Sequence, residues 1–129
     1  GQTATEEEIL EVRARGATLG AHTLHHVDMT ALPDPELQHQ IRRSRQRLEA
    51  YGQEFLAYAY PWGHHTIREV RAVREEGFSC AVEIGAAISL RMPDLYRLSR
   101  LDIQRDVELP DFVRMVTKTM RVPSLPKAL

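Results

Sequence analysis

Cysteine is almost missing from this sequence: Cys80 is the only one among 129 residues. A single thiol excludes an internal disulfide framework and a metal site made of several thiolates. Because Cys80 lies in an apolar run with Ala81 and Val82, we expect it to be a small, buried hydrophobic residue. The sequence also has no apolar run long enough to span a bilayer, and its first residues lack the basic-then-apolar pattern of a signal segment.

A strong charge of either sign is missing as well. The 17 basic and 18 acidic side chains give a formal net charge of −1. This balance provides no field to attract nucleic acid or an anionic membrane surface, so neither is expected as a partner. A local basic cluster at residues 42–47 falls in a helical pattern and is interpreted as a solvent-exposed face. With 43% hydrophobic residues, the chain is long enough for one domain with a core.

Segments with helix and strand patterns alternate along the chain. Capping signals and helical spacing predict helices at 5–15, 34–51, 66–76 and 110–120, and apolar runs predict strands at 17–21, 55–60, 78–84 and 96–103. Such alternation with short connections is typical of parallel strands joined by helices, so the predicted fold class is α/β. We expect one domain over residues 1–121, with a loop at 85–93, inward-facing Phe112, Val113 and Val116, and a loosely packed tail at 122–129.

Three histidines follow the first predicted strand directly: His22, His25 and His26. In parallel α/β folds ligands bind at the carboxyl ends of strands, which is where these imidazoles lie. Two neutral imidazoles suit zinc, cobalt, nickel or iron, with one carboxylate completing the set. His22 pairs with His26 at a spacing of four, or with His25 at three. The alternative is a histidine-rich surface loop. Spacing identifies no partner carboxylate among the candidates Asp28, Glu83 and Asp102.

A second unusual stretch ends the next predicted strand, at Tyr60-Pro61-Trp62-Gly63. A strand that ends in this way places an aromatic ring and backbone N–H groups at the mouth of a site. Trp62 is therefore a candidate platform for a sugar ring, and the N–H groups are candidate oxyanion donors. The alternative is a tight turn with Trp62 packed on a neighbouring helix. The following His64 and His65 are interpreted as exposed loop residues rather than additional ligands.

In this order the two stretches resemble the NodB-like polysaccharide deacetylases, which are carbohydrate esterase family 4 and its relatives. The family's His-Ser/Thr-x-x-His motif matches His22-Thr23-Leu24-His25-His26. One branch carries Phe-Ala-Tyr-Pro-aromatic-Gly, which is similar to residues 57–63, and its later arginine-bearing strand is similar to residues 95–101. The resemblance covers roughly residues 5–103.

The resemblance implies a distorted (β/α) barrel and a metal-dependent hydrolase that removes an N-acetyl or related acyl group from a polysaccharide or sugar. It makes His22 and His26 the imidazole ligands of a divalent metal, with zinc favoured. The backbone of Trp62 would stabilise the oxyanion, and Arg100 would orient a catalytic carboxylate, with Arg97 as the weaker candidate. It also suggests an extracytoplasmic or cell-envelope location.

The sequence departs from the family pattern in two places. It has no Asp-Asp pair, which in the family supplies the base and the third metal ligand, and no late apolar-x-His motif, which supplies the general acid. We therefore expect a partial barrel whose first βα units lie outside this chain. Such a chain alone would be inactive and would expose a sheet edge that favours self-association. The alternative function is a non-catalytic carbohydrate-binding protein or a degenerate homologue.

Overall fold

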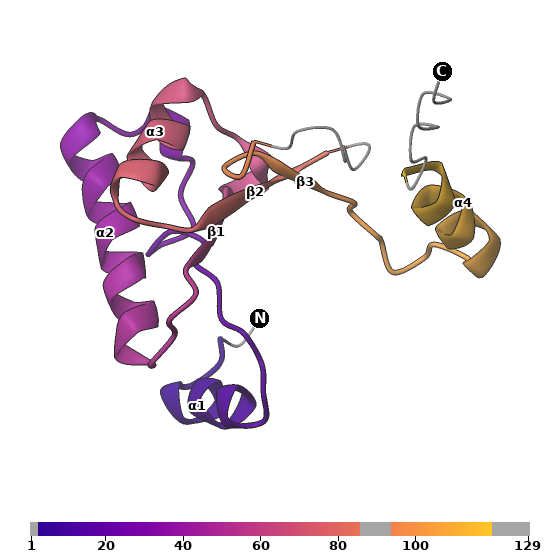
Figure 1. The fold of residues 1–129 in the computed structure, drawn as a ribbon, viewed down its shortest axis with the longest axis horizontal. Coiled ribbons are helices and arrows are strands. Elements are labelled where there is room, and N and C mark those ends of the chain that lie inside the picture. The colour runs from indigo at the N-terminus through magenta and orange to yellow at the C-terminus, as the bar shows by residue number, and fades with distance from the viewer. Residues whose placement is uncertain (1–2, 86–93, 120–129) are drawn as a thin grey trace, which may run out of the picture.

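The computed structural model describes residues 3–85 and 94–119, which form α-helices, short 3₁₀ helices and a small sheet (Figure 1). In chain order the elements are α1 (Glu6–Ala14), the 3₁₀ helix η1 (Met29–Ala31), α2 (Asp34–Ala50), β1 (Ala57–Ala59), the 3₁₀ helix η2 (Pro61–Gly63), α3 (Ile67–Glu75), β2 (Cys80–Ile84), β3 (Leu98–Arg100) and α4 (Leu109–Thr119). The four predicted helices are all present, with boundaries within one or two residues of those expected from the capping signals.

The three strands form a parallel sheet in the order β1, β2, β3. Tyr58 of β1 pairs with Ala81 of β2, and Glu83 of β2 pairs with Ser99 of β3. The connection from β1 to β2 runs through α3, and Figure 1 shows α2 and α3 side by side at one side of the sheet. Parallel strands joined by a crossover helix confirm the predicted α/β class.

The strand predicted at residues 17–21 is present only at its end. Ala21 forms an isolated parallel bridge with Tyr58, in which its N–H and carbonyl bond the backbone of β1 at 2.9 and 2.8 Å. Further back, the N–H of Leu19 donates to the side-chain amide oxygen of Gln53 at 3.1 Å. Because this N–H bonds a side chain, the ladder does not extend to residue 19. The prediction was wrong for residues 17–20, although the chain does lie beside β1.

Buried hydrophobic side chains from the sheet, α2 and α3 form one core. The ring of Tyr58 lies 5.0 Å from that of Phe78 and 5.7 Å from that of Tyr60, in edge-to-face arrangements that aromatic pairs prefer. Burying a side chain of this size contributes about 1.5–3 kcal/mol. The buried hydrophobic residues are Ala21, Met29, Leu37, Ile41, Leu48, Leu56, Tyr58, Tyr60, Val70, Val73, Phe78 and Ala81. Met29 and Ala21 flank the histidine stretch, so the core anchors it on both sides.

The start of α3 is tied to the segment that follows the histidines. Thr66 and Glu69 form the predicted capping box, and the buried Glu69 carboxylate also accepts from Arg68 at 2.6 Å. Burial raises the pKa of Glu69, but hydrogen bonds from Thr66 and Arg68 outweigh it, so the net pKa is lowered. Arg68 in turn donates to the carbonyls of Met29 and Leu32 at 3.0 and 2.9 Å. These bonds fix where η1 lies relative to α3.

The apolar residues of α4 do not face the core. Phe112 is 41% exposed and Val113 is 48% exposed, whereas Val116 is half-buried. Figure 1 shows why: α4 lies away from the sheet, across the molecule from α2. The prediction that these three residues face inward was therefore wrong for Phe112 and Val113, because helical spacing identifies an apolar face but not the surface that covers it.

Cys80 is only half-buried, so the prediction that it is buried was wrong. Its position at the first residue of β2 leaves part of it uncovered, and burial still raises the pKa of its thiol. The predicted loop after Gly85 and the predicted tail lie outside the described residues. Among the residues that the structure describes, no helix has the length and apolar character needed to cross a membrane.

Candidate active site

The loop after Ala21 brings His22 and His26 together. Their ring centroids lie 4.8 Å apart and both side chains are exposed. The loop is not the helical turn that a spacing of four residues suggests. Instead, Thr23 (φ 61°) and His26 (φ 52°) adopt left-handed backbone conformations, which are uncommon outside glycine and cluster at functional sites. The chain therefore folds back on itself, and the second imidazole returns to the first.

One hydrogen bond fixes which ring nitrogen of His22 carries the proton. Its Nδ1 lies 2.8 Å from the carbonyl oxygen of Ala59, at the end of β1. Because a carbonyl only accepts hydrogen bonds, Nδ1 carries the proton and donates it. In the neutral ring, Nε2 then keeps its lone pair and is available as a ligand. A backbone carbonyl in this role is a common partner of metal-binding histidines.

Gln40 of α2 organises the inner side of this loop. Its side chain is buried, and its Oε1 accepts from the backbone N–H groups of Leu24 and His25 at 3.0 and 3.1 Å. Its Nε2 lies 3.0 Å from Nδ1 of His25. The ring of His25 is therefore held toward α2, and the structure places His26, not His25, beside His22. The sequence analysis did not identify Gln40. Its one sequence signal is that it lies on the same face of α2 as the apolar Leu37 and Ile41, where a polar side chain is unexpected.

The turn at η2 places Trp62 against the histidine pair. Trp62 has a left-handed backbone (φ 53°), and its ring centroid lies 4.4 Å from that of His26 in an edge-to-face arrangement. The side chain is 53% exposed. The alternative, in which Trp62 packs on a neighbouring helix, does not describe this structure. An exposed aromatic ring beside two imidazoles is a surface on which a sugar ring could stack.

Asp28 links the histidine loop to the same turn. Its carboxylate caps η1 by accepting from Thr30 and also lies 3.1 Å from Nδ1 of His64. Hydrogen bonds from Thr30 and then from His64 lower the pKa of Asp28. His64 is exposed, as predicted. The pair connects the segment after His26 with the segment after Trp62.

His65 occupies a different environment from its neighbour. Its side chain is only 12% exposed, so the prediction of an exposed loop residue was wrong. The ring stacks on Tyr60 at 4.7 Å, Nδ1 lies 2.9 Å from the carbonyl oxygen of Gly63, and Nε2 lies 2.9 Å from the Glu83 carboxylate. No sequence signal pointed to this pair, because its members are separated by a helix and a strand.

Both candidate arginines lie beside Glu83, at the carboxyl end of β2. Nε of Arg97 is 3.7 Å from the carboxylate of Glu83, and Nε of Arg100 donates to its carbonyl oxygen at 3.4 Å. Both guanidinium groups are exposed. Arg100 is the last residue of β3, where it pairs with Ile84, so it projects from the same end of the sheet as the η2 turn.

The potential metal ligands of the described residues do not gather into a complete site. Across residues 3–85 and 94–119, no group of three or more His, Cys, Asp or Glu side chains is arranged to hold a metal ion. His22 and His26 fit as two ligands. Each carboxylate weighed from the sequence has a protein partner instead: Asp28 binds His64, Glu83 binds His65, and Asp102 accepts from Gln104.

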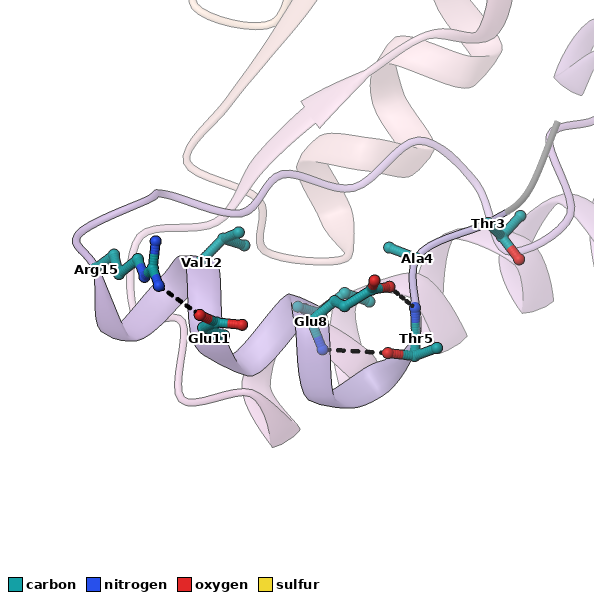
Figure 2. Close-up of a pocket in the computed structure, with 8 residues that line it drawn as sticks. Thr3, Ala4, Thr5, Glu8, Glu11, Val12 and Arg15 are labelled. Carbon is teal, nitrogen blue, oxygen red and sulfur yellow. Dashed lines mark hydrogen bonds and ion pairs between the residues drawn. The ribbon is translucent and has the colours of Figure 1, made fainter.

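A cavity of about 490 Å³ borders the histidine stretch and is lined by residues that include His22, Thr23, Arg47 and Tyr51. Figure 2 shows the surroundings of a larger cavity, of about 610 Å³, which runs along α1 beside the capping pair Thr5 and Glu8. No predicted site residue lines the larger cavity, so its size does not make it part of the candidate site.

The chain is similar to known proteins in both sequence and fold. A family model described as polysaccharide deacetylase matches residues 2–81. The chain is 22% identical over 100 residues to the Bacillus subtilis protein YxkH, provisionally named a polysaccharide deacetylase, covering 77% of this chain and 36% of that protein.

Solved structures of deacetylases share its fold, and two of them illustrate the match. The Streptococcus pyogenes deacetylase PplD in complex with acetate matches with a TM-score of 0.80 at 18% identity, covering 88% of this chain and 50% of that one. BC0361, a polysaccharide deacetylase from Bacillus cereus, matches with a TM-score of 0.72 at 20% identity, covering 85% and 35%. The chain therefore spans between about a third and a half of these relatives and has part of the NodB-like barrel, as predicted.

Proposed function

The chain belongs to the polysaccharide deacetylase family, and we propose that its protein removes N-acetyl groups from a sugar polymer with the help of a divalent metal. One observation carries the proposal: the ring of His26 lies between those of His22 and Trp62, at 4.8 and 4.4 Å. Two potential metal ligands and an exposed aromatic ring thus share one face, at the end of the sheet where ligands bind in such folds. The acetate bound to the relative PplD is the product that N-deacetylation releases.

In this proposal His22 and His26 hold the metal through one ring nitrogen each. The bond from Nδ1 of His22 to the carbonyl of Ala59 supports the role, because it leaves Nε2 free to act as the ligand. Zinc is the metal we favour, since neutral imidazoles suit it and its catalytic sites keep an open position. When bound, such an ion polarises a carbonyl and lowers the pKa of a coordinated water.

Trp62 and two arginines have proposed roles beside the metal. The backbone of Trp62 lies at the mouth of the site and would stabilise the oxyanion that develops on the substrate. Its exposed ring would bind a sugar face. Arg100 would orient a catalytic carboxylate from the end of β3, and Arg97 is the second candidate for that role. Both arginines have the exposure that such a contact requires.

Replacing both proposed ligands tests the metal assignment. In the full-length protein, the double substitution His22→Ala and His26→Ala should abolish the zinc that is retained after dialysis, as measured by elemental analysis. It should also stop acetate release from N-acetylglucosamine oligomers. His39→Ala is the matched control, because His39 is an exposed histidine on α2 outside the site. Unchanged metal content in the double variant would refute the assignment. Sugar binding without metal or acetate release would instead support the carbohydrate-binding alternative.

A further inference from the structure

The contacts of His65 require one more proton than a neutral imidazole carries. Nδ1 lies 2.9 Å from the carbonyl oxygen of Gly63, and Nε2 lies 2.9 Å from a carboxylate oxygen of Glu83. A carbonyl accepts only, and so does an ionised carboxylate, whereas a neutral imidazole can donate from one nitrogen alone. Both contacts are hydrogen bonds only if His65 is an imidazolium or Glu83 is a carboxylic acid.

The same pair supports the backbone at Trp62. His65 donates to the carbonyl of Gly63, the residue directly after Trp62, and its ring stacks on Tyr60 at 4.7 Å, so it contacts both ends of the η2 turn. Glu83 belongs to β2, the central strand, so its bond to His65 links the η2 turn to the sheet. The turn needs such support because Trp62 adopts a left-handed conformation (φ 53°), which persists only where its surroundings enforce it.

We propose that His65 and Glu83 share one proton and act as a positioning pair that fixes the Trp62 turn beside the histidines. The proposal rests on the proposed function, in which the backbone of Trp62 stabilises the oxyanion. Arg97 and Ser99 contact the Glu83 carboxylate, the former with Nε at 3.7 Å and the latter through a hydroxyl that donates at 3.4 Å. Arg100 donates to the backbone carbonyl of Glu83, and the ring of Tyr60 stacks on that of His65. The guanidinium of Arg97 is exposed and does not replace the short bond from His65.

Substitutions at His65 and Glu83 distinguish the hydrogen bonds of the pair from the packing of its side chains. His65→Phe keeps an aromatic ring against Tyr60 but removes both hydrogen bonds. Glu83→Gln keeps the bond to His65, because an amide N–H can donate to Nε2 of a neutral ring, whereas Glu83→Leu removes it. His39→Phe is the matched control. Circular dichroism identifies any variant that does not fold. If His65→Phe does not fold, the comparison of Glu83→Gln with Glu83→Leu still tests the proposal, because neither variant alters His65.

The first readout does not depend on catalysis. Trp62 is the only tryptophan of the 129-residue chain, so its fluorescence anisotropy decay reports the mobility of the turn. We expect faster Trp62 motion in His65→Phe and Glu83→Leu, and wild-type behaviour in Glu83→Gln and His39→Phe. In the wild-type chain labelled with ¹⁵N-histidine, Nε2 of His65 should show a hydrogen bond to Glu83 that is absent in Glu83→Leu. Unchanged anisotropy in His65→Phe and Glu83→Leu would overturn the proposal.

The second readout is activity in the full-length protein. His65→Phe and Glu83→Leu should lower kcat roughly 10- to 100-fold with KM little changed, because a misplaced group of this kind costs up to about 10²-fold. Glu83→Gln should restore most of kcat. An inactive wild type with the expected anisotropy changes would refute the proposed function and leave the positioning pair supported. An active wild type in which His65→Phe has full kcat would overturn the positioning role.

Discussion

Gly63 packs against Ile84 of β2, which makes Gly63→Ala a sharp test of this structure. Gly63 has a left-handed backbone (φ +73°), and a Cβ built on it would lie 3.0 Å from the backbone nitrogen of Ile84 and 3.1 Å from its Cβ. These atoms belong to β2 and cannot move independently of the sheet. Gly77, at the end of α3, has a similar conformation (φ +90°) with no atom within 4 Å of its Cβ position.

The comparison of the two glycines isolates the steric part of the cost. A left-handed conformation costs an alanine about 1–2 kcal/mol, and this applies to both sites. Crowding by an added methyl group in a packed region costs about 1–3 kcal/mol more, and this applies to Gly63 alone. The change in unfolded-chain entropy is the same for both substitutions and cancels. Gly63→Ala should therefore lower the free energy of unfolding by about 1–3 kcal/mol more than Gly77→Ala.

Urea unfolding followed by circular dichroism measures this difference. In thermal unfolding, each kcal/mol lost from the free energy of unfolding should lower Tm by roughly 4 °C for a chain of this size. The relief of crowding should also displace the neighbouring Trp62, so its fluorescence should change in Gly63→Ala and not in Gly77→Ala. Equal losses of stability in the two variants would show that the turn does not pack on Ile84, and the geometry of the site would then be wrong.

Two other side chains give tests of the scaffold. Replacing Gln40 with Leu leaves the N–H groups of Leu24 and His25 without their acceptor, so we expect about 1–3 kcal/mol less stability by urea unfolding and at least ~10-fold weaker zinc binding by titration calorimetry. Glu69, whose pKa is lowered, contributes stability that is present above its ordinary pKa and is lost as pH falls through the lowered value. In Glu69→Gln, Tm should therefore fall less steeply as the pH drops below the ordinary range of a glutamate carboxyl. A pH dependence of Tm equal to that of the exposed control Glu75→Gln would contradict this.

Local signals predicted the elements of this fold well. The capping pairs that begin α1 and α3 lie three residues apart, and each forms the expected reciprocal hydrogen bonds. Such signals succeed because the sequence spacing itself sets the distance between the groups. The sequence also placed the histidine stretch and Trp62 at neighbouring strand ends, where parallel topology brings them together.

The sequence by itself determined the α/β class, the helix starts and the two motifs that mark the candidate site. Spacing left His25 and His26 open as partners of His22, and the family resemblance favoured His26. Only the tertiary structure shows the contact that turns His25 away, because that contact comes from Gln40, 15 residues away on α2. It alone decided that His65 is half-buried against Glu83 and that α4 leaves Phe112 exposed. Each of these outcomes depends on which surfaces meet after the chain folds, and neighbouring residues along the chain carry no information about those contacts.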